Sequence, residues 1–252
     1  MKMIKKENGF TLLEVMMVVA MSGVVLAAFL SLYHMLVRAE TSQDGAIAMN
    51  QSGRMALTTM EREIRMAGCD PDQTAGASII TADTHLLLFS LDYDDGASNG
   101  PDGDCCDANE IIRYALDNDA DNNGINDNIS SGVQCNLERA TGTGCDTTGT
   151  LCPAGGGCSP LNLALNIDAL NFVYLDANGA QLATPVADPD DIRMIEVTII
   201  ARSGELVRGL LPPQPDRTRY LNLQGNTVLV PQNDRFRRLA LSTSIKVRNA
   251  AM

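Results

Sequence analysis

The chain has 252 residues, of which 19 are basic and 31 acidic, giving a formal net charge of -12 at pH 7. An acidic surplus of this size repels phosphate backbones, so we expect no nucleic acid partner. Seven cysteines without a CxxC pair, beside only two histidines, favour disulfides in an oxidising compartment over a cytosolic redox motif.

An apolar segment begins almost at once. Residues 10–37 contain one formal charge, Glu14, and no proline. A helix of this length reaches roughly 42 Å, more than the ~30 Å hydrocarbon core of a bilayer. Three lysines lie within the first six residues and only Arg38 closely follows the segment, so the charge bias keeps the amino end in the cytoplasm and exports the rest.

The position of the small residue Gly9 distinguishes this segment from a secretory signal. Such a signal places its small-residue cleavage site after the apolar region, whereas Gly9 stands before it. A simple uncleaved membrane anchor is the alternative. That alternative leaves Glu14 unexplained, because a carboxylate deep in a bilayer costs about 2.5 to 3.5 kcal/mol.

The run GFTLLEVMMVVAMSGVV, which starts at Gly9, resembles the class III signal of type IV prepilins and of the pseudopilins of type II secretion. The resemblance implies that residues 1–9 are a leader peptide, that a prepilin peptidase cleaves between Gly9 and Phe10, and that the new amino group of Phe10 is methylated. It also implies that Glu14 pairs with the Phe10 amine of a neighbouring subunit, which methylation leaves positively charged. A misplaced subunit would leave the carboxylate uncompensated, so the pair favours the correct register.

The polar sequence after Arg38 retains an apolar stripe. Apolar residues recur there at steps of three and four and predict an amphipathic helix over residues 38–67, ending at Gly68. The stripe consists of Leu57, Met60, Ile64 and Ala67. We therefore expect one long helix over residues 10–68, with 10–37 as the transmembrane part and filament core.

Residues 69–252 predict an extracytoplasmic β-sheet domain, because short apolar runs alternate there with turns. We expect strands in 79–91 and 110–116, a hairpin at Asn178-Gly179, and half-buried antiparallel strands over 195–201 and 239–247. A sheet that buries one face against the striped helix satisfies both patterns. The expected fold is α+β, the lollipop shape that the pilin resemblance also implies.

Four segments resemble the PilW-type minor pilins, and less closely the larger minor pseudopilins: MALTTMEREIRMAGCDP, NIDALNFVYLDANG, RMIEVTIIARS and FRRLALSTSIKVRN. This resemblance implies a low-copy subunit of a priming or tip complex. Its partners would be the prepilin peptidase, other minor and major pilins, the inner-membrane assembly platform and, before assembly, membrane lipid. The chain would span the inner membrane once and then move to the periplasm and the cell-surface pilus.

An acidic, cysteine-rich insert is expected over residues 92–160. Its acidic part, 92–127, contains ten aspartates and Glu110 against a single arginine. Alternating aspartates followed by a later one resemble the oxygen ligands of a calcium loop, although asparagines replace the glycine and the final glutamate of an EF-hand. The candidate calcium ligands are Asp117, Asp119, Asp121 and Asp127; a second, less regular cluster is Asp92, Asp94 and Asp95. A solvated acidic loop without metal remains the alternative.

All seven cysteines are disulfide candidates, and an odd number leaves at least one thiol or a bond to another chain. Their pairing stays open, and zinc binding is the alternative. The candidates are Cys69, Cys105, Cys106, Cys135, Cys145, Cys152 and Cys158.

Three functions follow from these patterns. The first is a minor pilin in pilus priming or at the tip, and a minor pseudopilin of a type II secretion system is its runner-up. The second is an adhesive or ligand-binding tip module built on the insert. The third, an enzyme, is not expected, because no GxSxG, HExxH, phosphate loop or dinucleotide fingerprint occurs.

Overall fold

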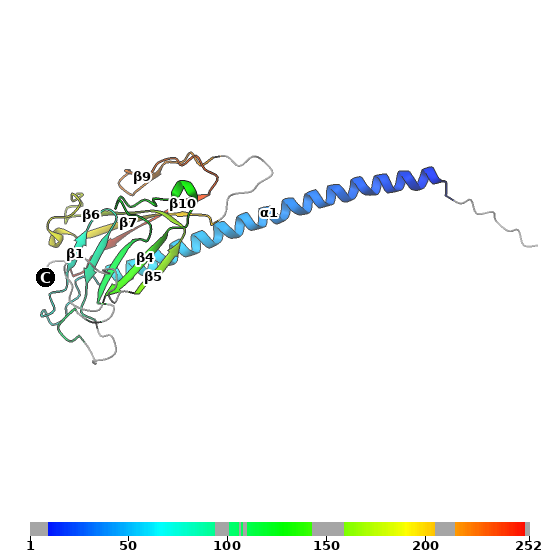
Figure 1. Cartoon of the computed structure of the whole chain (residues 1–252). Helices are drawn as coiled ribbons and strands as arrows, with labels where there is room; N and C mark the ends of the chain where they lie inside the picture. The colour runs from blue at the N-terminus through cyan, green and yellow to red at the C-terminus, as the bar shows by residue number, and fades with distance from the viewer. Residues whose placement is uncertain are drawn as a thin grey trace, which may run out of the picture. The chain divides into compact units, whose positions relative to one another are not determined.

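The computed structural model describes residues 10–93, 101–105, 107, 110–142, 159–204 and 215–249. The described residues form two compact units, one made of residues 10–44 and one made of the rest. Helix α1 (Leu12–Ile64) begins in the first unit and ends in the second. All strands belong to the second unit, and Figure 1 labels most of them.

Two larger antiparallel sheets and a short hairpin make up the second unit. The first sheet has the strand order β1-β2-β3-β4-β5, and the second has the order β10-β7-β6. The strands of the first sheet are β1 (Ile79–Ala82), β2 (Leu87–Ser90), β3 (Ile111–Leu116), β4 (Asn136–Gly142) and β5 (Ser159–Leu165). Those of the second are β6 (Ile167–Leu175), β7 (Met194–Arg202) and β10 (Arg238–Lys246), and the hairpin pairs β8 (Tyr220–Leu221) with β9 (Thr227–Leu229). Short 3-10 turns occur at Ile129–Ser131 and Pro189–Asp191.

The second half of α1 packs against both larger sheets. Met60 and Ile64 of the predicted stripe are fully buried, and one hydrophobic cluster joins them to residues of both sheets. Gly53 lies so close to β7 and β10 that a Cβ there would meet Leu241 and Ile199. The expected α+β fold, a long N-terminal helix followed by antiparallel sheet structure, is confirmed.

The helix ends in a turn that is tied to the first sheet. After Ile64 the chain continues as a turn to Gly68, whose φ of +71° favours glycine. The Gly68 amide donates to the Ser90 carbonyl at 2.9 Å. This contact fixes the point at which the chain leaves α1 and enters the sheet region.

The expectation that residues 195–201 form a half-buried strand is wrong. Strand β7 is central in its sheet, and both of its faces are buried apart from its first residue. On one face Ile200 packs with Tyr220 and Leu229 of the β8–β9 hairpin. On the same strand Glu196 is held by the Gln224 amide at 3.0 Å. A covering hairpin therefore hides polar residues that alternation assigns to solvent. Strand β10 does have one more exposed face.

Two strand boundaries also differ from the expectation. Residues 79–91 form the two antiparallel strands β1 and β2, because the Asp83 amide bonds to the Leu86 carbonyl and turns the chain. At Asn178-Gly179 the predicted turn is present, with the Asp176 amide bonded to the Ala180 carbonyl at 2.9 Å. Only an isolated bridge between Leu175 and Gln181 follows that turn, and β6 pairs with β7 instead.

Candidate functional site

The first half of α1 exposes apolar side chains around its whole circumference. An 18-residue window of the helix has a mean hydropathy of 2.5, and none of it is buried within the structure. Leu12 and Phe29 are 81% and 67% exposed. Burying one side chain of this size stabilises the buried state by about 1.5–3 kcal/mol relative to leaving the side chain in water. The segment is therefore long and apolar enough for a bilayer or for a bundle of similar helices.

The predicted processing site lies where the described chain begins. Gly9 falls outside the described residues, and Phe10, the first described residue, is 85% exposed. Glu14 lies in the first turn of α1, where its amide donates to the carbonyl of Thr11 at 3.1 Å and to the Thr11 hydroxyl at 3.3 Å. Thr11 thus caps the helix, and the exposed Glu14 carboxylate sits at the positive end of the helix dipole.

A partly buried ionic contact fastens the end of α1 to the first sheet. Glu63 accepts a hydrogen bond from the Tyr114 hydroxyl of β3 and from Arg139 Nε of β4, the latter at 2.9 Å. Burial and the Glu63 charge both raise the pKa of Tyr114. Burial opposes the charge of Arg139, but Glu63 outweighs it and raises the pKa of that guanidinium. The hydroxyl therefore stays protonated and the arginine charged.

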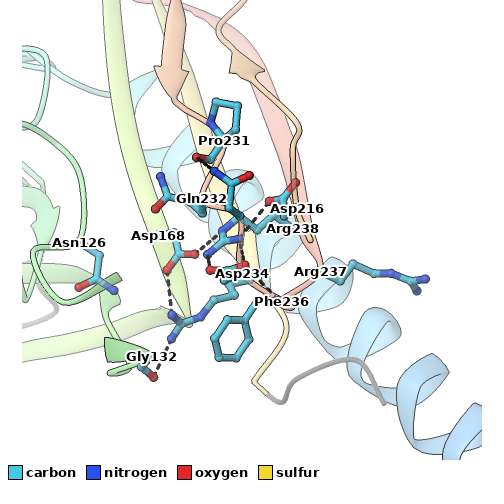
Figure 2. Close-up of polar contacts among 12 residues, drawn as sticks. Asn126, Gly132, Asp168, Asp216, Pro231, Gln232, Asp234, Phe236, Arg237 and Arg238 are labelled. Carbon is cyan, nitrogen blue, oxygen red and sulfur yellow. Dashed lines mark hydrogen bonds and ion pairs between the residues drawn. The ribbon is translucent and has the colours of Figure 1, made fainter. Parts of the chain in front are cut away.

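Strands β6 and β10 are joined by the charge network in Figure 2, centred on Arg238. Arg238 Nε donates to the fully buried Asp168 at 2.7 Å, and Nη1 donates to Asp216 at 3.0 Å and to Asp234 at 2.7 Å. Burial alone would lower the pKa of Arg238, but the hydrogen bonds and charges of Asp234 and Asp168 raise it. One guanidinium therefore compensates three carboxylates from separate segments.

Arg202 of β7 approaches the same network from the other side. Its Nη1 lies 3.4 Å from Asp168 Oδ1, and its Nη2 donates to the Val133 carbonyl at 3.0 Å. The guanidinium carbon stands 4.5 Å from the centre of the Phe236 ring, a cation–π contact. The side chains of Arg202, Asp168 and Arg238 are at most 2% exposed, so this part of the network holds β6, β7 and β10 together inside the fold. The Asp234 side chain is 23% exposed.

The structure brings three of the four predicted calcium ligands together. Ligand oxygens of Asp119, Asp121 and Asp127 lie within 4.8 Å of one another, the one such group of three acidic, histidine or cysteine residues in the described part of the chain. Asp117 points elsewhere, because its carboxylate accepts both the main-chain and the side-chain amide of Asn136 at 2.8 Å. The three remaining carboxylates can supply oxygens to a hard cation.

Position 124, in the loop that carries Asp119, Asp121 and Asp127, requires a glycine. Its φ is +79°, and a Cβ there would collide with the Leu170 carbonyl of β6. The Gly124 carbonyl accepts from the Leu170 amide at 2.8 Å, and its amide donates to Asp119 at 2.8 Å. The loop is therefore seated directly on the second sheet.

The second acidic cluster is only partly described, since Asp94 and Asp95 fall outside the described residues. Asp92 is buried, at 1% exposure. The structure places Glu110 beside it, equally buried, with the Tyr93 amide donating to Glu110 Oε1 at 2.9 Å. The position of Glu110 within the acidic stretch 92–127 does not distinguish it from an exposed acid.

Three of the seven cysteines are described, and all three carry free thiols in the structure. Cys69 and Cys105 are half-buried and Cys135 is buried. Burial raises the pKa of the Cys105 thiol to about 11, and burial followed by Asp117 raises that of Cys135. The other four candidates, Cys106, Cys145, Cys152 and Cys158, lie outside the described residues.

Comparison with known proteins gives two findings. Residues 4–30 match the family model described as the prokaryotic N-terminal methylation motif. A type IV-like pilin from Thermus thermophilus has a similar structure, with a TM-score of 0.49, 15% sequence identity, and coverage of 81% of this chain and 98% of that one. No curated protein matches. The residues that match the methylation motif therefore include the start of the long apolar helix α1, and the antiparallel sheets follow that helix in the chain.

Proposed function

We propose that the chain is a minor pilin of a type IV pilus that acts in priming or tip assembly. The observation that carries this proposal is the match of residues 4–30 to the methylation motif, which overlaps the exposed, apolar first half of helix α1. A segment of this kind is suited first to a bilayer and then to a bundle of identical segments. The function is structural, since assembly needs matched surfaces and no reacting group.

Processing in this proposal occurs between Gly9 and Phe10. Cleavage there creates a charged amine four residues before Glu14, and methylation preserves its charge. In the assembled bundle, Glu14 of one subunit pairs with the amine of another. Without that partner the carboxylate costs about 2.5–3.5 kcal/mol in an apolar surrounding, which is a factor of roughly 70–370 in the occupancy of a correctly docked subunit.

The experiment separates processing from docking. Gly9→Leu should leave an uncut, membrane-retained precursor, whereas Gly23→Ala should be cut normally, because no atom lies within 4 Å of a Cβ at position 23. Glu14→Ala should be cut and methylated but should fail to enter pili. Glu40→Ala, a change of an exposed acid on the same helix, is its control and should leave piliation unchanged.

Wild-type piliation by the Glu14→Ala variant would contradict the docking role. A deletion strain scored for both pili and protein secretion distinguishes the minor pilin from its runner-up. Loss of pili with secretion intact supports the pilus assignment. Loss of secretion alone assigns the chain to a type II secretion system as a minor pseudopilin.

We also propose, as a separate feature, that the loop carrying Asp119, Asp121 and Asp127 binds calcium. The support is the proximity of the three carboxylates and the seating of Gly124 on β6. Charge neutralisation by a divalent ion would relieve the mutual repulsion of the three acids.

A further inference from the structure

A buried acid lies just after β2. Asp92 is 1% exposed, and neither of its carboxylate oxygens accepts a hydrogen bond within the described residues. Burial raises the pKa of this carboxyl; the amides of Gly103 and Asp102 nearby oppose burial but do not reach hydrogen-bonding geometry with either oxygen. Buried carboxylates are normally paired or bound to a metal, because their lost hydration must be replaced.

A second buried acid stands beside the first. Glu110, also 1% exposed, accepts the Leu91 amide on its carbonyl and the Tyr93 amide on Oε1, each at 2.9 Å. Both neighbours of Asp92 in the sequence are therefore held by Glu110. Its other oxygen accepts the Asp107 amide at 2.9 Å. These donors are neutral amides, and each carboxylate oxygen keeps a further lone pair for a ligand.

The surroundings of the pair are acidic. After burial, Asp102 and Asp70 are the charges that raise the pKa of Asp92, and Asp107 and Asp92 are those that raise the pKa of Glu110. Asp168 is just as buried, but Arg238 and Arg202 compensate it. In the part of the chain that the structure describes, no ion pair joins Asp92 or Glu110 to a basic side chain.

We propose that Asp92 and Glu110 bind a divalent cation of the hard, oxygen-preferring class, for which calcium is the probe. Calcium takes six to eight oxygen ligands, so the two carboxylates supply part of the shell, and main-chain carbonyls and water supply the rest. The bound ion ties the segment after β2 to the segment before β3. The Asp92 amide also donates to the Cys69 carbonyl at 2.7 Å, so the site stiffens the chain where it leaves α1.

This site is separate from the loop of Asp119, Asp121 and Asp127 and does not depend on the proposed pilin function. The test therefore uses the full chain in detergent with Asp119→Asn and Asp121→Asn already in place. In that background, thermal melts followed by circular dichroism should rise by about 5–10 °C when free calcium reaches about 100 times its Kd, relative to a chelated sample. Adding Asp92→Asn or Glu110→Gln should abolish the rise.

Asp72→Asn, a change of an exposed acid from the preceding turn, is the matched control and should retain the full calcium response. If Asp92 simply carries a proton, calcium will not raise the melting temperature of the Asp119→Asn, Asp121→Asn protein. Adding Asp92→Asn will then leave that melting temperature unchanged, and this result overturns the proposal. A shift with zinc and none with calcium overturns it as well. Should Asp92→Asn fail to fold, calorimetric titration of Glu110→Gln decides, since the proposal requires one bound calcium fewer than the background protein.

Discussion

Arg238 offers the sharpest test of how the sheet region is held together. Replacing it with methionine keeps the aliphatic stem but removes the guanidinium that Asp168, Asp216 and Asp234 share. Of its two ion pairs among the described residues, Asp168 then keeps the one with Arg202, at 3.4 Å, and Asp216 loses its ion pair. Removing one partner of a buried ion pair destabilises by about 3–5 kcal/mol.

For a chain of this size each kcal/mol lowers the melting temperature by about 2–4 °C, so Arg238→Met should melt about 6–20 °C below wild type. Circular dichroism melts of the full chain in detergent measure this directly. Arg237→Met is the matched control, because the Arg237 side chain is exposed and points away from the network in Figure 2. If both variants melt within about 2 °C of wild type, the network does not stabilise the sheets.

Two further predictions concern backbone conformation and pH. Gly124→Ala should lower the free energy of unfolding by about 2–5 kcal/mol, because the new Cβ collides with the Leu170 carbonyl and the backbone has a positive φ. Gly179→Ala is the control: its φ is also positive, +78°, but the space around it is open, so the loss should be only about 1–2 kcal/mol. Equal losses of unfolding free energy in urea titrations would show that the collision does not occur. Burial would raise the pKa of Asp234, but hydrogen bonds from Arg238 outweigh it and lower that pKa. The stabilisation from Asp234 is therefore present above the unfolded-state pKa of about 3.9 and lost as pH falls through the lower folded-state value. Asp234→Asn should accordingly be less stable than wild type at pH 7, and a stability gap that stays constant down to pH 2 would show that the carboxylate charge is not the cause.

Local patterns predict much of this fold from the sequence. The apolar run 10–37 and the stripe through Met60 and Ile64 both depend on residues close together in the chain, and so do the strands around β3 and β10. Alternation fails at β7 because its burial is decided by the β8–β9 hairpin, which follows it in the sequence and covers its second face. The alternation of apolar and polar residues along one strand cannot indicate that a distant segment of the chain covers its polar face.

The buried charges were missed for the same reason. Glu63 meets Arg139 across 76 residues, and Arg238 meets Asp168 across 70. Neither pair has a local signature. Glu110 and Asp92 are likewise adjacent only because β2 and β3 pair. The calcium-loop spacing predicts four ligands, of which Asp119, Asp121 and Asp127 lie close together, whereas the Asp117 carboxylate bonds to Asn136 instead.

We propose that the chain is cut and methylated at the head of its apolar helix before it assembles. Mass spectrometry of the protein isolated from pili sheared from cells tests this most directly. We expect a chain that begins at N-methylated Phe10 and lacks residues 1–9. Recovery of material that still begins at Met1 would contradict it.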